Sequence, residues 1–111
     1  MKTITTKDDF DRDLGSGSES FMLFYSAWCP FCTMFLPAFE KAAAGGPAAF
    51  VKVSTDDLPE LEEAFAVEVV PTVLFFKDGK LKKRLDGALG RGLTEENLKD
   101  FIKACGPKAK K

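Results

Sequence analysis

The chain has 111 residues, with 16 Lys or Arg, 17 Asp or Glu, three cysteines and no histidine. This length fits one domain, placed at residues 1–111, and leaves no room for a second. The balanced charge predicts neither a nucleic-acid nor a membrane-surface partner. The lack of histidine excludes a histidine base or a histidine metal ligand, so any reaction at a side chain is expected to depend on sulfur.

The two ends of the chain show no targeting pattern. No segment looks like a cleaved leader, and no apolar run approaches the length of a membrane span. We therefore expect a cytoplasmic protein, although a mature periplasmic protein would also lack its leader. Residues 105–111 are rich in lysine and are expected to form a flexible, solvated tail.

The first part of the chain predicts an edge strand, a helix and a buried strand. Residues 2–5 suit the edge strand, and Thr6 with Asp9 resembles a capping box that opens a helix ended by Gly15. A short Gly-Ser connection leads to Phe21–Tyr25, a run of apolar and aromatic residues too short for a buried helix. This run suits a strand covered on both faces.

A helix that carries two cysteines is predicted to follow this strand at once. Pro30 suits the first helical position, which places Cys29 at the N-cap. The helix is expected to run to about Ala44, with a kink at Pro37, and to stop at the glycine pair that begins with Gly45.

The helix start separates the roles of the two sulfurs. Unpaired N–H groups and the positive end of the helix dipole point toward Cys29, which stabilises a thiolate, the reactive form of cysteine. Cys32 shares an apolar stripe with Phe35, Leu36 and Phe39 and is expected to face the sheet. The pattern predicts an attacking thiol at Cys29 and a resolving thiol at Cys32. The alternative is two core cysteines.

The rest of the chain continues the alternation of strand and helix. The expected elements are a strand at 48–53, a helix at 58–67, a strand at 72–76, a strand at 81–86 and a last helix capped by Thr94 and ended by Gly106. Asp78 and Gly79 predict a tight hairpin between the last two strands. The order β-α-β-α-β-α-β-β-α predicts an α/β fold with a central mixed sheet and helices on both faces.

Five motifs, in order along nearly the whole chain, resemble those of the thioredoxin family. They are Trp28-Cys29-Pro30-Phe31-Cys32 (similar to Trp-Cys-Gly-Pro-Cys), Pro37 of the second helix, Val70-Pro71-Thr72 at the cis-proline turn, Phe76-Lys77-Asp78-Gly79 at the hairpin, and Asp86-Gly87-Ala88 at the groove loop. The resemblance implies a thioredoxin fold and a thiol–disulfide oxidoreductase that reduces protein disulfides without a bound cofactor or metal.

The resemblance also implies a substrate groove beside Cys29. Its expected border is Trp28, Pro30, Phe31, Val70, Pro71, Gly87 and Ala88. Read without the resemblance, Trp28 could instead pack in the core and Gly87 could be an ordinary strand end. The implied partners are disulfide-bearing proteins and a reductase such as thioredoxin reductase, and the chain is expected to be a monomer.

Two departures from the family bear on chemistry. Leu23 stands where the family usually carries a buried aspartate that, with a lysine matched by Lys52, manages the proton of the resolving cysteine. We expect resolution by Cys32 to depend on water or Lys52 and to be slow near neutral pH. The Pro30-Phe31 pair between the cysteines predicts a weaker reductant of intermediate potential.

Several alternatives stay open at this point. A glutathione-linked enzyme fits the Pro-Phe pair but not Trp28, a net oxidase needs an oxidising compartment, and a binding module would use the groove without redox turnover. Zinc or an iron–sulfur cluster would need ligands beyond the cysteine pair. Cys105 completes an apolar stripe and is expected in the core, with a regulatory thiol as the alternative. Phe31 and Met34 form either a partner patch or tolerated exposed residues.

Overall fold

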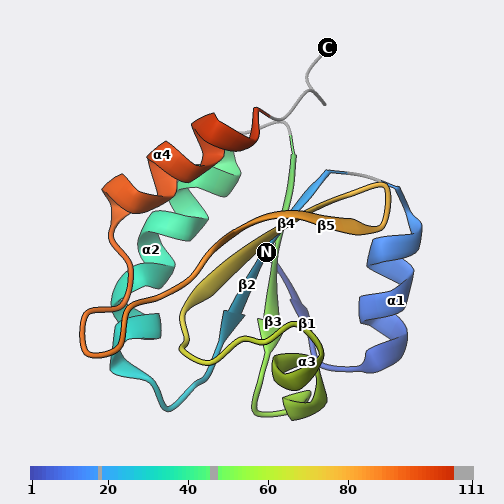
Figure 1. Cartoon of the computed structure of the whole chain (residues 1–111), viewed down its shortest axis with the longest axis horizontal. Helices are drawn as coiled ribbons and strands as arrows, with labels where there is room; N and C mark the ends of the chain where they lie inside the picture. The colour runs from blue at the N-terminus through green and yellow to red at the C-terminus, as the bar shows by residue number, and fades with distance from the viewer. Residues whose placement is uncertain (18, 46–47, 107–111) are drawn as a thin grey trace.

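The computed structural model describes residues 1–17, 19–45 and 48–106, which form a five-stranded sheet with helices on both faces (Figure 1). Its elements are β1 (Lys2–Ile4), α1 (Lys7–Gly15), β2 (Ser20–Tyr25), α2 (Pro30–Gly45), β3 (Ala49–Ser54), α3 (Pro59–Ala64), β4 (Thr72–Lys77), β5 (Lys80–Leu85) and α4 (Glu95–Cys105). This is the order predicted from the sequence.

The sheet is mixed, as predicted, and β2 lies at its centre. The strand order is β1-β3-β2-β4-β5, in which β3 runs parallel to β1 and β2, whereas β4 is antiparallel to both β2 and β5. Leu23 of β2 therefore lies between Lys52 of β3 and Val73 of β4. The carboxyl ends of the parallel strands β2 and β3 meet at one edge of the sheet, where α2 begins.

Side chains that alternate along β2 fill two separate cores. Phe21 and Leu23 pack in the core under α2 and α4, and Met22 and Phe24 pack in the core under α1 and α3. All four are fully buried. Figure 1 shows the same division, with α2 and α4 together on one side of the sheet and α1 and α3 on the other. Because helices cover both faces of the sheet, side chains on both sides of β2 are apolar.

Helix α2 begins at Pro30, as predicted, and runs one residue beyond Ala44, to Gly45. Pro37 lies inside it. Its buried residues are Cys32, Phe35 and Phe39, so the predicted stripe faces the sheet. Each buried aromatic side chain contributes roughly 2–3 kcal/mol to folding.

The predicted helix at 58–67 is wrong in its length, because α3 covers only Pro59–Ala64. Phe65 leaves the helical conformation, and Ala66 takes a left-handed conformation with a φ of 53°. This turn directs Val67 inward, where its N–H donates to the Glu62 carbonyl and its side chain is buried. Apolar spacing alone does not mark such a turn.

The hairpin and the C-terminal cap follow the predicted turn chemistry. Asp78 and Gly79 both have positive φ, at 55° and 76°, which suits a tight hairpin whose twist matches its strands. Gly106 caps α4 in the left-handed region, so Cys105 is the last helical residue rather than the first of the predicted tail. The remainder of that tail, residues 107–111, lies outside the described residues. Within the described ranges no helix is long and apolar enough to cross a membrane.

Candidate active site

Cys29 lies between β2 and α2, at the carboxyl-terminal end of the central strand. Its carbonyl oxygen accepts hydrogen bonds from the N–H groups of Cys32 at 3.1 Å and Thr33 at 3.2 Å, which makes it the N-cap of α2. The thiol is half-buried and donates to the carbonyl oxygen of Val70 across a sulfur–oxygen distance of 3.5 Å. This sulfur therefore lies between the helix start and the segment before β4.

Cys32 lies deeper, on the face of α2 that packs on the sheet. Its side chain is 3% exposed, and the cysteines are free thiols. Burial raises the pKa of Cys32 to about 12. The Cys29 thiol and the negative charge of Asp56 also raise this pKa, whereas a hydrogen bond from the backbone N–H of Ser26 to the sulfur lowers it. The inner thiol is thus protonated near neutral pH and must lose a proton before it can attack.

The opposite wall of the site is formed where β4 begins. The Val70-Pro71 peptide bond is cis, as the family resemblance implied. A β-carbon on Gly87 would lie 2.3 Å from the Pro71 carbonyl oxygen, so this position requires glycine. The Thr72 hydroxyl accepts from the Gly87 N–H at 3.2 Å and donates to the Val69 carbonyl. Gly87 thus lies just after the end of β5 and packs directly on Pro71.

Apolar side chains are exposed on the cysteine-bearing segment and on the loop after β5. Trp28 is 86% exposed, which excludes the core-packing alternative, and Leu89 in the loop after β5 is equally exposed. Phe31 is half-buried because its ring packs against Gly92, where an added β-carbon would lie 2.9 Å from the Phe31 β-carbon. Met34 is exposed.

The loop after β5 closes on itself beside Phe31. Ala88, one of the expected groove residues, is exposed and pairs with Gly92 through backbone hydrogen bonds of 3.2 and 2.8 Å. Pro30 is exposed at the start of α2, whereas Pro71 is buried and Val70 is half-buried. The expected groove residues thus come from three segments that meet near Cys29.

Leu23 and Lys52, which occupy the positions of the family's acid and its lysine, are neighbours across β2 and β3. Leu23 is fully buried. The Lys52 Nζ lies over the Tyr25 ring, 5.5 Å from its centroid. A cavity of about 90 Å³ is lined by Leu23, Tyr25, Ser26, Cys32, Thr33 and Leu36.

Asp56 is a site residue that sequence reasoning missed. Its carboxylate accepts from the Ser26 hydroxyl and from the Ala27 N–H, each at 2.9 Å, and so fixes the loop that leads into the helix. The Ser26 hydroxyl in turn accepts from the Trp28 N–H at 3.2 Å. The available signal was the polar Ser-Thr-Asp-Asp run after a strand parallel to β2, because carboxyl ends of parallel strands meet at one edge.

Arg84 is a second residue that was missed, and it connects two segments behind the groove. Its guanidinium donates to the carbonyl oxygens of Phe65 at 2.8 Å and Ala66 at 3.1 Å, and it pairs with Asp86. Arg84 therefore ties the end of α3 to the residue before Gly87. A single basic residue on an edge strand gives no sequence signal for such a role.

Half-buried Cys105 packs against the core under α2 and α4. Burial raises its pKa to about 11, while the positive charge of Lys83 acts in the opposite direction. This placement agrees with the core reading rather than with a freely exposed thiol.

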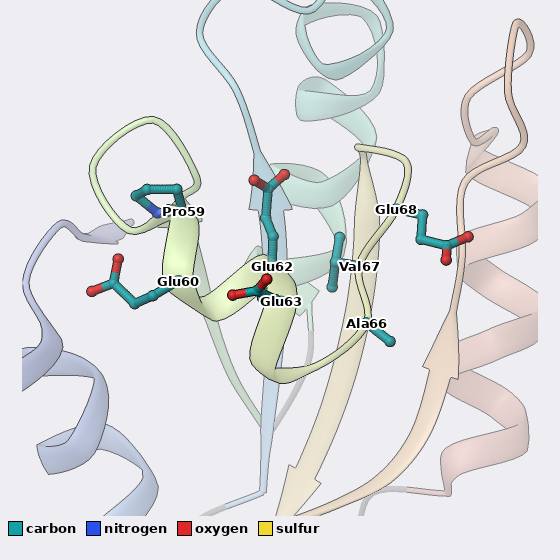
Figure 2. Close-up of a pocket in the computed structure, with 7 residues that line it drawn as sticks. All are labelled: Pro59, Glu60, Glu62, Glu63, Ala66, Val67 and Glu68. Atoms are coloured by element: carbon teal, nitrogen blue, oxygen red, sulfur yellow. The ribbon is translucent and has the colours of Figure 1, made fainter.

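A larger hollow beside α3 contains neither active-site cysteine. It has a volume of about 720 Å³ and is lined by Pro59, Glu60, Glu62, Glu63, Ala66, Val67 and Glu68. Figure 2 shows the Glu60 and Glu68 side chains pointing to opposite sides of it. Burial raises the pKa of Glu62, which lines this hollow, and the charge of Asp56 raises it further.

Comparison with known proteins gives a consistent result. The family model described as Thioredoxin matches residues 1–104. Thioredoxin of Mycoplasmoides gallisepticum is 34% identical over 100 residues, covering 89% of this chain and 100% of that protein. Thioredoxin of Mycolicibacterium smegmatis is 35% identical over 102 residues, covering 87% and 91%. The structure of Fasciola hepatica thioredoxin is 28% identical and superposes with a TM-score of 0.82 over 94% of this chain and 98% of that one.

Proposed function

Because this chain belongs to the thioredoxin family and is a thiol–disulfide oxidoreductase, we propose that it reduces protein disulfides with Cys29 as the attacking thiol and Cys32 as the resolving thiol. The observation that carries this assignment is the unequal burial of the two sulfurs. Cys29 is half-buried at the helix start, whereas Cys32 is 3% exposed beneath it. A substrate disulfide can therefore approach Cys29 first.

The reaction is a two-electron exchange in two steps. The Cys29 thiolate attacks one sulfur of the substrate disulfide, which breaks that bond, forms a mixed disulfide and releases one substrate thiolate. Cys32 then loses its proton and attacks the Cys29 sulfur. This forms the Cys29–Cys32 disulfide and releases the second substrate thiolate, after which an external dithiol or reductase restores the pair.

The groove proposed for the substrate combines an apolar rim with backbone groups. Trp28, Pro30, Phe31 and Ala88 would form the rim, and Val70, Pro71 and Gly87 the floor. The Val70 carbonyl, which accepts from the Cys29 thiol, is a backbone group that a substrate segment could meet beside the reacting sulfur. Close packing of Gly87 on Pro71 supports a floor of fixed shape.

Lys52 is proposed to assist the resolving step by its charge. Its Nζ lies over the ring of Tyr25, which lines the same cavity as Cys32. A positive charge near a thiol favours the thiolate. Lys52 would thus oppose the effect of burial on Cys32 without touching the sulfur.

The partners proposed are disulfide-bearing proteins and a reductase of the thioredoxin reductase class, with the chain acting as a monomer in the cytoplasm. A reducing compartment suits this direction of flux, because it keeps thiols reduced. The membership of the family supports a reductase over glutathione as the electron source.

Insulin reduction with one electron source at a time tests this proposal. Turnover is expected with thioredoxin reductase and NADPH, and it should disappear when Cys29 and Cys32 are both replaced by serine. Turnover with glutathione alone would instead favour the glutathione-linked alternative. Binding of a partner that survives the double serine replacement, without any turnover by the wild type, would favour the binding module.

A further inference from the structure

We propose that Asp56 accepts the proton that Cys32 loses when it resolves the mixed disulfide. The inference rests on the proposed function, since it deepens the role given there to Cys32. Asp56 lies on the loop after β3, and Leu23 leaves β2 without a carboxylate at the buried position below the cysteines.

The resolving step needs a proton acceptor. Cys32 is 3% exposed and packs on the sheet through the same stripe as Phe35 and Phe39, so bulk water does not reach its sulfur freely. A buried thiol that stays protonated attacks slowly unless a nearby group removes its proton. Lys52 carries a positive charge and cannot serve as that acceptor while it is protonated.

Ser26 links Asp56 to Cys32. Its backbone N–H donates to the Cys32 sulfur, and its hydroxyl donates to the Asp56 carboxylate at 2.9 Å. The Ala27 N–H donates to the other oxygen of that carboxylate at 2.9 Å. Ser26 is therefore the residue that contacts both the Asp56 carboxylate and the Cys32 thiol. The negative charge of Asp56 raises the pKa of both Cys32 and Tyr25.

The cavity beside Cys32 reaches Ser26, whose hydroxyl donates to the Asp56 carboxylate. Its volume is about 90 Å³. One water occupies roughly 30 Å³ in the liquid, so a bridging water fits. Hydroxyl-bearing residues Tyr25, Ser26 and Thr33 share the lining with Cys32 and give such a water polar partners. Leu23 forms the apolar wall.

The ionisable groups that surround Asp56 come from several elements. They are Tyr25 of β2, Cys32 of α2, Asp57 of the same loop and Glu62 of α3, with Lys52 of β3 beyond Tyr25. Among them, Asp57 provides a charge-matched control, because its carboxylate accepts from the Ser54 hydroxyl at 2.8 Å instead of from Ser26.

The resolving step needs no added oxidant, because the substrate disulfide supplies the bond that breaks. The Cys32 proton passes through the cavity to the Asp56 carboxylate as the Cys32 sulfur attacks the Cys29 sulfur. The Cys29–Cys32 bond forms, and the bond between Cys29 and the substrate breaks. The departing substrate thiolate keeps the electron pair and takes a proton from solvent, while Asp56 returns its proton to water.

A purely electrostatic role for Asp56 predicts the opposite effect of its removal. The negative charge of Asp56 raises the pKa of Cys32, so neutralising it would favour the thiolate and speed the attack. Loss of a proton acceptor would slow the attack. The sign of the change in Asp56→Asn therefore separates the two roles.

Both steps can be followed in one reaction with 5,5′-dithiobis(2-nitrobenzoate) as the probe disulfide. In stopped flow, reduced full-length protein releases one nitrothiolate when Cys29 attacks and a second when Cys32 resolves. Asp56→Asn is expected to keep the first rate and slow the second by roughly tenfold or more near pH 7. Asp57→Asn should keep both rates within about twofold, because it makes the same charge change away from Ser26.

Added acetate supplies a readout that a structural role of Asp56 would not move. At fixed pH and ionic strength, the second rate of Asp56→Asn should rise in proportion to acetate concentration, while the wild type responds little. The second rate of Asp56→Asn should also rise more steeply with pH than the second rate of the wild type. An unchanged or faster second rate, or a slow rate that ignores acetate, would overturn the proposal. A first phase that survives Cys29→Ser would instead contradict the proposed function.

Discussion

Gly87 packs so closely on Pro71 that a β-carbon at Gly87 would lie 2.3 Å from the Pro71 carbonyl oxygen. The contact is fixed from the side by Thr72, whose hydroxyl accepts from the Gly87 N–H. Gly87 and Pro71 belong to the proposed floor of the groove, together with Val70, whose carbonyl accepts from the Cys29 thiol. Any side chain at Gly87 must displace one of the two segments.

Gly87→Ala should therefore lower stability and weaken substrate binding. A displaced backbone contact of this kind costs about 1–3 kcal/mol, measurable by urea unfolding. The KM for insulin should rise more than kcat falls, because the chemistry at Cys29 is unchanged. Gly15→Ala is the matched control, since no heavy atom would lie within 4 Å of its β-carbon. A Gly87→Ala protein with wild-type stability and KM would show that the contact has no role.

Leu23→Asp should accelerate disulfide reduction near neutral pH. The new carboxylate would line the cavity beside Cys32, opposite Lys52, and supply a second proton acceptor. A carboxylate at this fully buried position should also cost about 2–4 kcal/mol of stability.

Leu23→Asn controls for that change in shape and polarity, since an amide cannot take the proton. The test is the rate of insulin reduction between pH 6 and 9 for both variants. Equal rates and equal pH profiles in wild type and Leu23→Asp would contradict the idea that the proton of Cys32 limits turnover.

Arg84→Lys should loosen the segment before the groove while keeping the charge. Lysine cannot reproduce the simultaneous bonds to the carbonyls of Phe65 and Ala66 and to the Asp86 carboxylate. We expect a loss of about 1–3 kcal/mol in urea unfolding and a higher KM for insulin. Lys82→Arg on the same strand should change neither quantity, and equal effects of the two replacements would argue against a specific tie at Arg84.

Stability of the reduced protein should fall at alkaline pH. Burial raises the pKa of Cys32 to about 12 from an ordinary value of 9.0, so the unfolded chain releases this proton at lower pH than the folded chain. The contribution of the protonated Cys32 thiol to the free energy of unfolding is fully present below pH 9 and is lost as pH rises toward 12. The slope should approach about 1.4 kcal/mol per pH unit.

Urea unfolding under reducing conditions from pH 7 to 10.5 measures this slope. Cys32→Ala should flatten it, and Cys105→Ala should flatten it as well, because burial raises the pKa of that thiol to about 11. If the wild type and Cys32→Ala lose stability in parallel, the folded protein does not hold Cys32 protonated.

Local patterns in the sequence predicted the placement of the cysteine pair. Pro30 marks the start of α2, and the apolar spacing after it orients Cys32 inward, so the two sulfurs could be distinguished without coordinates. The exposure of Trp28 agrees with the expectation from the family resemblance and from its place beside an exposed nucleophile. The intermediate redox potential expected from Pro30-Phe31 stays a prediction.

Contacts between distant segments could not be predicted in this way. The bond from Ser26 to Asp56 depends on the parallel pairing of β2 with β3, and the Arg84 contacts depend on the early end of α3 at Ala64. Ala66 adopts a left-handed conformation that its residue type does not favour, so tertiary packing decides where that helix stops.

The central claim, that Cys29 attacks and Cys32 resolves, is tested most directly by trapping the mixed disulfide. Cys32→Ser and Cys29→Ser are each reduced, mixed with oxidised insulin, quenched with alkylating agent and resolved by mass spectrometry without reductant. The account predicts a covalent adduct at Cys29 in Cys32→Ser, released by dithiothreitol, and no adduct in Cys29→Ser. An adduct that forms on Cys32 in Cys29→Ser at a comparable rate would contradict it.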